Sequence, residues 1–155
     1  MKTSFILTSL AAALSASAQL VTFGVVDEKN NNLGLPNNLH SGAGFDFYFV
    51  GANQEILQYN IDNNGVATLN VNYEYPFHVG AFENYFAVGP AVTPANLEIV
   101  DNKITNWNFW ACYDTSDPYN YSAKNRAIVV NEKGNSTAPG SQCIPVFITV
   151  LDVVY

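Results

Sequence analysis

The two cysteines have the greatest capacity for chemistry in this sequence. Cys112 lies in the aromatic segment Thr105 to Asp114 (TNWNFWACYD), and Cys143 follows it 31 positions later. A catalytic thiol requires a neighbouring histidine that lowers its pKa. His40 and His78 are far from Cys112 in the sequence, and no cysteine-protease signature surrounds it. The pattern therefore does not favour a nucleophile.

Other catalytic patterns are weak. The nearest carboxylate pairs for a glycosidase are Asp114 with Asp117 and Glu74 with Glu83, but their flanking residues assign no acid or base role. The His40-Ser41 pair lacks the glycine that a hydrolase elbow places two residues before its serine. Zinc-ligand spacing, phosphate-binding glycine loops and EF-hand loops are absent from the sequence. We therefore expect no catalysis, cofactor or metal.

The first eighteen residues have the pattern of a secretory signal peptide. Lys2 supplies a positive charge, Phe5 to Leu14 form a short apolar run, and Ala16-Ser17-Ala18 provide the small side chains of a cleavage site. The apolar run is too short to span a bilayer. We expect cleavage before Gln19, so that residues 1–18 are removed and residues 19–155 form a single secreted domain of 137 residues.

Export determines how the cysteines are interpreted. Because the secretory pathway is oxidising, two cysteines in a secreted chain predict one disulfide, between Cys112 and Cys143. In the chain-entropy model, closing a loop of this length stabilises the fold by about 3 to 4 kcal/mol.

Charge and hydropathy restrict the partners. The formal net charge is −7 and becomes −8 once Lys2 is removed, so binding to nucleic acid or to an anionic membrane surface is disfavoured. The apolar C-terminal segment 143–155 has the outline of a GPI signal. However, Asp152 interrupts it, and cleavage would discard Cys143. We expect a buried strand there and no membrane association after signal cleavage.

Strand signals dominate the rest of the chain, and no window of ten or more residues has helical periodicity. In the run 66–75, Ala67, Leu69, Val71, Tyr73 and Tyr75 would share one half-buried face. The expected strands are 44–50, 54–61, 66–75, 85–89, 95–102, 104–113, 126–131 and 143–155. The chain is therefore predicted to be all-β.

A weak internal spacing bears on the architecture. Asp27, Asp62 and Asp101 each follow an aliphatic residue and precede an amide-rich turn, at intervals of 35 and 39 residues. Three such units fit a β-trefoil, but hairpins of an antiparallel β-sandwich also recur at regular spacings. The sequence leaves both architectures open.

Aromatic residues around Cys112 are candidates for stacking against sugar rings. In an extended strand Trp107 and Phe109 point to one side, whereas Trp110 and Cys112 point to the other. Core packing accounts for most of these rings, and an outward set would remain for a glycan. The candidate stacking residues are Trp107, Trp110, Tyr113, Tyr119 and Tyr121.

Two N-glycosylation sequons lie between the cysteines. Asn120-Tyr121-Ser122 and Asn135-Ser136-Thr137 both match the acceptor pattern, in a stretch rich in proline, asparagine and serine. The segment closed by the disulfide is therefore predicted to be exposed and to carry glycans at Asn120 and Asn135.

Several short motifs resemble those of the fungal PhiA-like cell wall proteins. The resemblance rests on the signal peptide, on FGVV at 23–26 and LHSG at 39–42, on Cys112 with Cys143, and on the closing VLDVV at 150–154. Members of that family carry further cysteines nearer the N-terminus, which this chain lacks. The resemblance implies a secreted protein of the wall or medium, with a role in wall structure or in the development of spore-bearing cells and no established catalysis.

Together these observations predict a secreted, extracellular, fungal cell-wall-associated structural protein without catalysis. Its expected partners are wall polysaccharide or wall proteins. The alternative is a carbohydrate-binding module that recognises wall polysaccharide through exposed aromatic residues.

Overall fold

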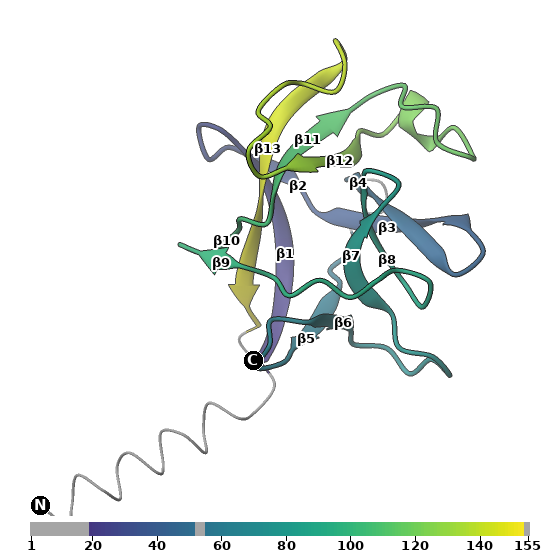
Figure 1. The fold of residues 1–155 in the computed structure, drawn as a ribbon, viewed down its shortest axis with the longest axis vertical. Coiled ribbons are helices and arrows are strands. Elements are labelled where there is room, and N and C mark those ends of the chain that lie inside the picture. Colours follow the sequence, from purple (N-terminus) through teal and green to yellow (C-terminus); the bar gives the residue numbers. More distant parts are fainter. Residues whose placement is uncertain (1–18, 52–54, 154–155) are drawn as a thin grey trace, which may run out of the picture.

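The computed structural model describes residues 19–51 and 55–153 (Figure 1). The predicted signal peptide lies outside these residues. The strands are β1 (Gln19–Asp27), β2 (Asn32–Gly34), β3 (Pro36–Gly42), β4 (Phe45–Val50), β5 (Gln58–Ile61), β6 (Ala67–Leu69), β7 (His78–Phe82), β8 (Tyr85–Gly89), β9 (Ile99–Val100), β10 (Lys103–Ile104), β11 (Trp107–Cys112), β12 (Ala127–Glu132) and β13 (Cys143–Asp152). One 3₁₀ turn, η1 (Tyr121–Ala123), lies between β11 and β12.

The strands form one antiparallel sheet that closes on itself. β1 pairs with β5 on one side and with β13 on the other, with Val21 opposite Asp152 and Asp27 opposite Val146. From β5 the pairing continues through β6, β7 and β8 to β4 and β12, and then through β11 back to β13. The prediction of an all-β fold with one disulfide is confirmed. The β1–β13 pairing makes this a continuous sheet rather than two separate ones.

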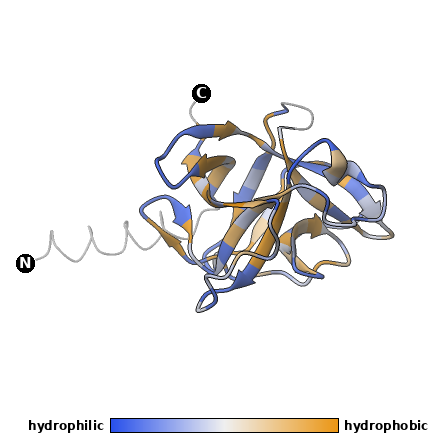
Figure 2. Cartoon of the chain, turned by 90° about the horizontal axis from the view of Figure 1, so that it is seen from above, coloured by the Kyte–Doolittle hydropathy of each residue, from blue (hydrophilic) through white to orange (hydrophobic). Residues whose placement is uncertain are grey.

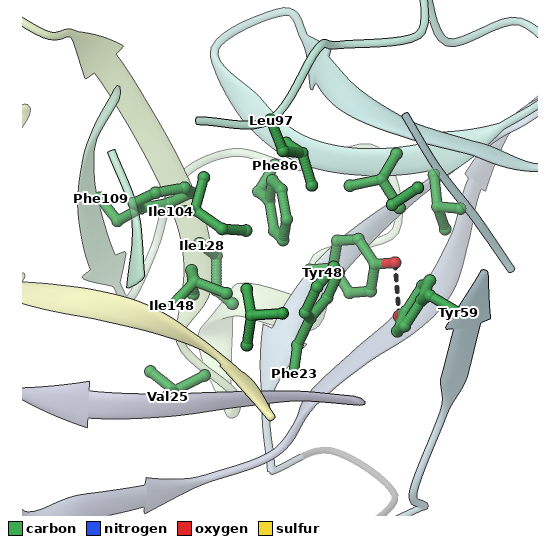
Figure 3. Packing of buried hydrophobic residues seen from close by; sticks show 14 of the residues in the cluster. Phe23, Val25, Tyr48, Tyr59, Phe86, Leu97, Ile104, Phe109, Ile128 and Ile148 are labelled. Atoms are coloured by element: carbon green, nitrogen blue, oxygen red, sulfur yellow. Dashed lines mark hydrogen bonds between the residues drawn. The ribbon is translucent and has the colours of Figure 1, made fainter. Parts of the chain in front are cut away.

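The main hydrophobic core fills the inside of the closed sheet. Alternate residues of β1 point inward, and Val21, Phe23 and Val25 are buried there, as a period of two requires. Aromatic side chains from four other strands, β4, β5, β8 and β11, meet them (Figure 3). The buried aromatic side chains of this cluster are Phe23, Tyr48, Tyr59, Phe86 and Phe109.

A second cluster lies on the outer face of β4, β8, β11 and β12. Its buried members are Phe47, Phe49, Ala87, Val92, Trp110, Cys112, Ala127 and Val129. Leu39 and Phe45 from the β3–β4 hairpin pack against it, as does Tyr121. These four strands are therefore buried on both faces. In Figure 2, hydrophobic residues lie mainly along the strands and hydrophilic residues in the peripheral turns.

The predicted strand 66–75 is wrong beyond its first residues. Only Ala67–Leu69 form β6, and the chain then leaves the sheet. The N–H of Asn70 donates to the carbonyl of Gln58, after which Pro76, which has no N–H, interrupts further pairing. The side chains that were expected on the buried face but are exposed are Val71, Tyr73 and Tyr75.

The regularly spaced aspartates form two kinds of turn. Asp27 and Asp62 each accept, through Oδ1, the backbone N–H groups two and four residues further on. The side-chain hydrogen bond from Asn31 lowers the pKa of Asp27. Asp101 and Asn102 instead adopt left-handed conformations in the two-residue turn between β9 and β10. The spacing therefore does not support three equivalent units.

A buried pair of tyrosine hydroxyls lies in the main core. The Oη atoms of Tyr48 and Tyr59 are 2.6 Å apart, and both residues are fully buried (Figure 3). We expect Tyr59→Phe to lower the free energy of unfolding by about 1 to 3 kcal/mol, because it leaves the Tyr48 hydroxyl without its partner. Urea titrations of Tyr48→Phe, Tyr59→Phe and the double variant measure this. The double variant should cost less than the sum of the single ones, and strict additivity would contradict the pairing.

The same pair gives the fold a sensitivity to alkali. Burial is the main cause that raises the pKa of both Tyr48 and Tyr59 above the ordinary value of 10.0. Below about pH 10 the two tyrosine hydroxyls are protonated in both the folded and the unfolded chain. The stabilisation that depends on these protonated hydroxyls is therefore complete in that range. It is lost at higher pH, where the unfolded chain releases protons that the folded chain retains.

Candidate functional site

The disulfide between Cys112 and Cys143 is confirmed, with an S–S distance of 2.05 Å. The two residues lie directly opposite each other where β11 pairs with β13. Cys112 is 1% exposed and belongs to the outer hydrophobic cluster, against which Cys143 also packs. The bridge is therefore positioned by strand register and packing.

A pocket of about 490 Å³ opens beside the disulfide. Three separate segments line it: the β7–β8 turn with Tyr85 (83–85), the end of β11 with the residues after it (112–115), and the segment that leads into β13 (139–143). Val129 of β12 completes the lining. The N–H of Tyr113 donates to the carbonyl of Gln142 at 3.1 Å, which joins two of these segments. The disulfide is thus part of the pocket wall.

The β7–β8 turn holds a carboxylate and an amide at the pocket. Glu83 and Asn84 both adopt left-handed conformations, with φ of 49° and 67°, between the paired residues Phe82 and Tyr85. Two such residues match the right-handed twist of a hairpin, although a glutamate is uncommon there. The N–H of Val130 donates to the Asn84 carbonyl at 2.8 Å, which ties the turn to β12.

The second wall is held by a chain of side-chain hydrogen bonds. The Tyr85 hydroxyl lies 2.8 Å from Oγ1 of Thr115, whose N–H donates to Oγ of Ser122 at 2.9 Å. The Ser122 hydroxyl donates to the carboxylate of Asp117, which also accepts the N–H groups of Ser122 and Tyr121. Burial raises the pKa of Tyr85. The segment 113–122 is therefore fixed by a buried carboxylate.

The pocket is acidic. Glu83 and Asp114 are the charged side chains among its lining residues, and both are exposed to solvent. Neither forms an ion pair within residues 19–51 and 55–153. The guanidinium of Arg126 lies 4.8 Å from the centre of the Tyr113 ring but does not line the pocket. The lining thus contains two carboxylates and no cationic side chain, although the Arg126 guanidinium lies against the ring of the lining residue Tyr113.

The structure separates the five candidate stacking residues. Trp107 is half-buried against the main core, whereas Trp110 is 8% exposed and belongs to the outer cluster. Tyr113 is half-buried and lines the pocket. Tyr119 is 53% exposed, and its ring lies 5.8 Å from that of the half-buried Tyr121. Tyr119 is therefore the most accessible ring of this group.

Trp110 is more buried than an outward-facing strand residue usually is. The face of β11 that carries Trp110 and Cys112 is covered by the outer cluster, so both faces of the strand are packed. The Nε1 atom of Trp110 is buried without a hydrogen-bond partner in the described part of the chain. Most of the Trp110 ring is therefore packed against other side chains. The sequence predicts core packing for most of the five candidate stacking residues.

His40 and Ser41 lie in the β3–β4 hairpin and not at the pocket. His40 is exposed, with Nδ1 3.6 Å from the carboxylate of Asp46 and its ring 5.7 Å from that of Tyr119. The Ser41 hydroxyl donates to the carbonyl of Leu39 and accepts the N–H of Phe47. This pairing accompanies a bulge in the strand. Both hydrogen bonds of the Ser41 hydroxyl are therefore made within the hairpin.

The two sequons occupy different surroundings. Asn120 is exposed with φ of 56°, but the hydroxyl of Ser122 in the same sequon is buried against Asp117. Asn135 lies in an exposed segment, where its Oδ1 accepts the N–H of Thr137 at 3.1 Å. Both asparagines are in the surface region between the cysteines, and their glycosylation stays a prediction.

The carboxylate pairs suggested by the sequence are rearranged. Asp117 caps the turn around η1 and does not line the pocket, and Glu74 lies in the exposed loop after β6. Glu83 and Asp114 instead line the same pocket. The signal for this wall is weak, because Asn84 suits a left-handed turn position whereas a glutamate such as Glu83 is uncommon there. Sequence reasoning missed Asn84, Tyr85 and Gln142 as pocket residues.

Within residues 19–51 and 55–153, no helix is long and apolar enough to cross a membrane. The same residues contain no group of three or more His, Cys, Asp or Glu side chains placed to hold a metal ion. No family model, curated protein or solved structure matches the chain.

Proposed function

We propose that this chain is a secreted structural protein of the fungal cell wall that acts without catalysis. In this proposal it contributes to wall organisation or to the development of spore-bearing cells, through contacts with wall polysaccharide or wall proteins. The observation that carries the proposal is the Cys112–Cys143 disulfide. Such a bridge persists in oxidising compartments and is rare in the cytosol, which supports export.

Two further observations support the wall assignment. The short motifs that resemble those of the PhiA-like proteins include both cysteines, and the strands that carry them are joined by the bridge. The closed sheet has a buried interior with aromatic residues from five strands. A stable fold of this kind suits a protein that persists outside the cell.

Export and processing are tested by fractionating cultures of a filamentous fungus that expresses the full chain. We expect the mature protein in the wall fraction and the medium, with Gln19 as its first residue in N-terminal sequencing or mass spectrometry. A chain that begins at Met1 and stays in the cytosol would contradict the proposal. A variant with Ala16 and Ala18 replaced by leucine should show impaired processing, because large side chains do not fit the cleavage site.

A second candidate function is recognition of a carbohydrate. The specific observation in its favour is the pocket beside the disulfide, which combines carboxylates, amides and tyrosines in a concave site. This version depends on the pocket rather than on a row of exposed tryptophans, since Trp110 is buried and Trp107 half-buried.

A further inference from the structure

We propose that the pocket beside the disulfide binds a cationic amino sugar, such as a glucosamine unit with a free amine in a polysaccharide. This inference rests on the second candidate function and names its ligand class. Its basis is the pocket formed by segments 83–85, 112–115 and 139–143, together with the charges that those segments carry.

The size and construction of the pocket suit a small polar ligand. Its volume of about 490 Å³ lies within the range of ordinary ligand sites. Each wall is fixed by the fold: the Asn84 carbonyl accepts an N–H from β12, Thr115 is bound to Tyr85 and Ser122, and Cys143 is covalently tied to Cys112. A site that is already formed loses little conformational entropy when it binds.

The uncharged lining matches the surface of a sugar ring. The side-chain amides of Asn84 and Gln142 and the hydroxyl of Ser141 offer donors and acceptors for sugar hydroxyls. Tyr113 adds an aromatic ring, which can pack against the apolar face of a pyranose. These groups would serve a neutral and a charged sugar equally, so they do not discriminate between them.

The charges provide the discrimination. Glu83 and Asp114 come from two different walls, neither forms an ion pair in the described part of the chain, and no basic residue lines the pocket. An anionic saccharide would be repelled by both carboxylates and by the overall charge of −7. An ammonium group would be attracted by both. The pocket therefore favours an amino sugar with a free amine over its N-acetylated or hydroxylated counterpart.

The test is a calorimetric titration of the secreted protein with three oligomers of equal length. They are built from glucosamine, from N-acetylglucosamine and from glucose, and are compared at mildly acidic pH, where the amine of glucosamine is protonated. We expect the glucosamine oligomer to bind about fivefold more tightly than the other two. This preference should shrink as salt is added, because exposed charges are screened.

Substitution of the two carboxylates locates the binding. Glu83→Gln with Asp114→Asn should abolish the preference, while Asn at position 114 tolerates the left-handed backbone. The matched control is Glu74→Gln with Asp101→Asn: both residues are exposed outside the pocket, and Asp101 is also left-handed, so the preference should remain. The single substitution Asp114→Asn removes one of the two charges. It should therefore reduce the free-energy difference between binding of the glucosamine oligomer and binding of the other two by about half.

Three results would overturn the inference. They are no binding of the glucosamine oligomer, equal affinity for all three oligomers, or an equal loss of the preference for glucosamine in the pocket variant and the control variant. Its failure is distinct from failure of the wall proposal, because the protein can lie in the wall fraction and bind no amino sugar. Release of shortened oligomers during the titration would contradict the absence of catalysis, while supporting the pocket as the sugar site.

Discussion

Replacing Cys112 and Cys143 together by alanine is expected to lower the free energy of unfolding by about 3 to 4 kcal/mol. The bridge closes a loop across 31 positions and therefore restricts the unfolded chain. Cys112 also contributes packing to the outer cluster, which adds to the loss. Urea titrations of both proteins, followed by circular dichroism, measure the difference.

The matched control for this prediction is a reducing agent. It should destabilise the parent protein by a similar amount and leave the double variant unchanged. A loss below about 1 kcal/mol would show that the bridge contributes little, since native disulfides usually contribute 2 kcal/mol or more.

Truncation of Phe86 should be the most damaging single change in the main core, at about 3 to 5 kcal/mol for Phe86→Ala. The ring is fully buried and lies among core side chains (Figure 3). Its centre is within 6.3 Å of four other aromatic centres. The surrounding rings come from three strands, β1, β4 and β11, and cannot collapse into the cavity without distorting the closed sheet. These neighbours are Phe23, Tyr48, Trp107 and Phe109.

Thermal or urea unfolding of Phe86→Ala measures this effect, and Tyr75→Ala is the control. Tyr75 is 61% exposed, so its truncation should change the free energy of unfolding by no more than about 0.5 kcal/mol. Similar losses for the two variants would contradict the assignment of Phe86 to the centre of the core.

The sequence predicted the strands that carry strong local signals. The runs at 44–50, 104–113, 126–131 and 143–155 coincide with β4, β11, β12 and β13, with β12 extending one residue further, to Glu132. β-branched and aromatic residues fit such a pleated, packed surface. The disulfide followed from compartment and cysteine count. These features depend on local composition, which one sequence displays directly.

Other strands depend on their partners more than on their own composition. β3 has the polar sequence PNNLHSG, yet it pairs with β4 along six residue pairs and covers the outer cluster with Leu39. At 71–75 the alternation of apolar residues continues, but the partner strand does not. Strand pairing and side-chain packing therefore outweigh the intrinsic strand propensity of these segments. The same reason made the burial of Trp110 hard to predict, since alternation cannot identify a strand that is covered on both faces.

The pocket was only partly predictable. Asp114 and Glu83 were singled out as acidic residues, but their joint position depends on the pairing of β8 with β12 and of β11 with β12, which brings separate turns together. The role of Asp117 as a buried cap also depends on the path of the chain after β11. Such juxtapositions are properties of the tertiary structure and leave no short motif.

The central claim is that this protein is exported and matures with its cysteines joined. The most direct test is thiol trapping with mass spectrometry on protein isolated without reductant from a fungal culture. The account predicts that neither Cys112 nor Cys143 is alkylated before reduction and that both are alkylated after it. Alkylation of both cysteines before reduction, in a chain that still begins at Met1, would contradict it.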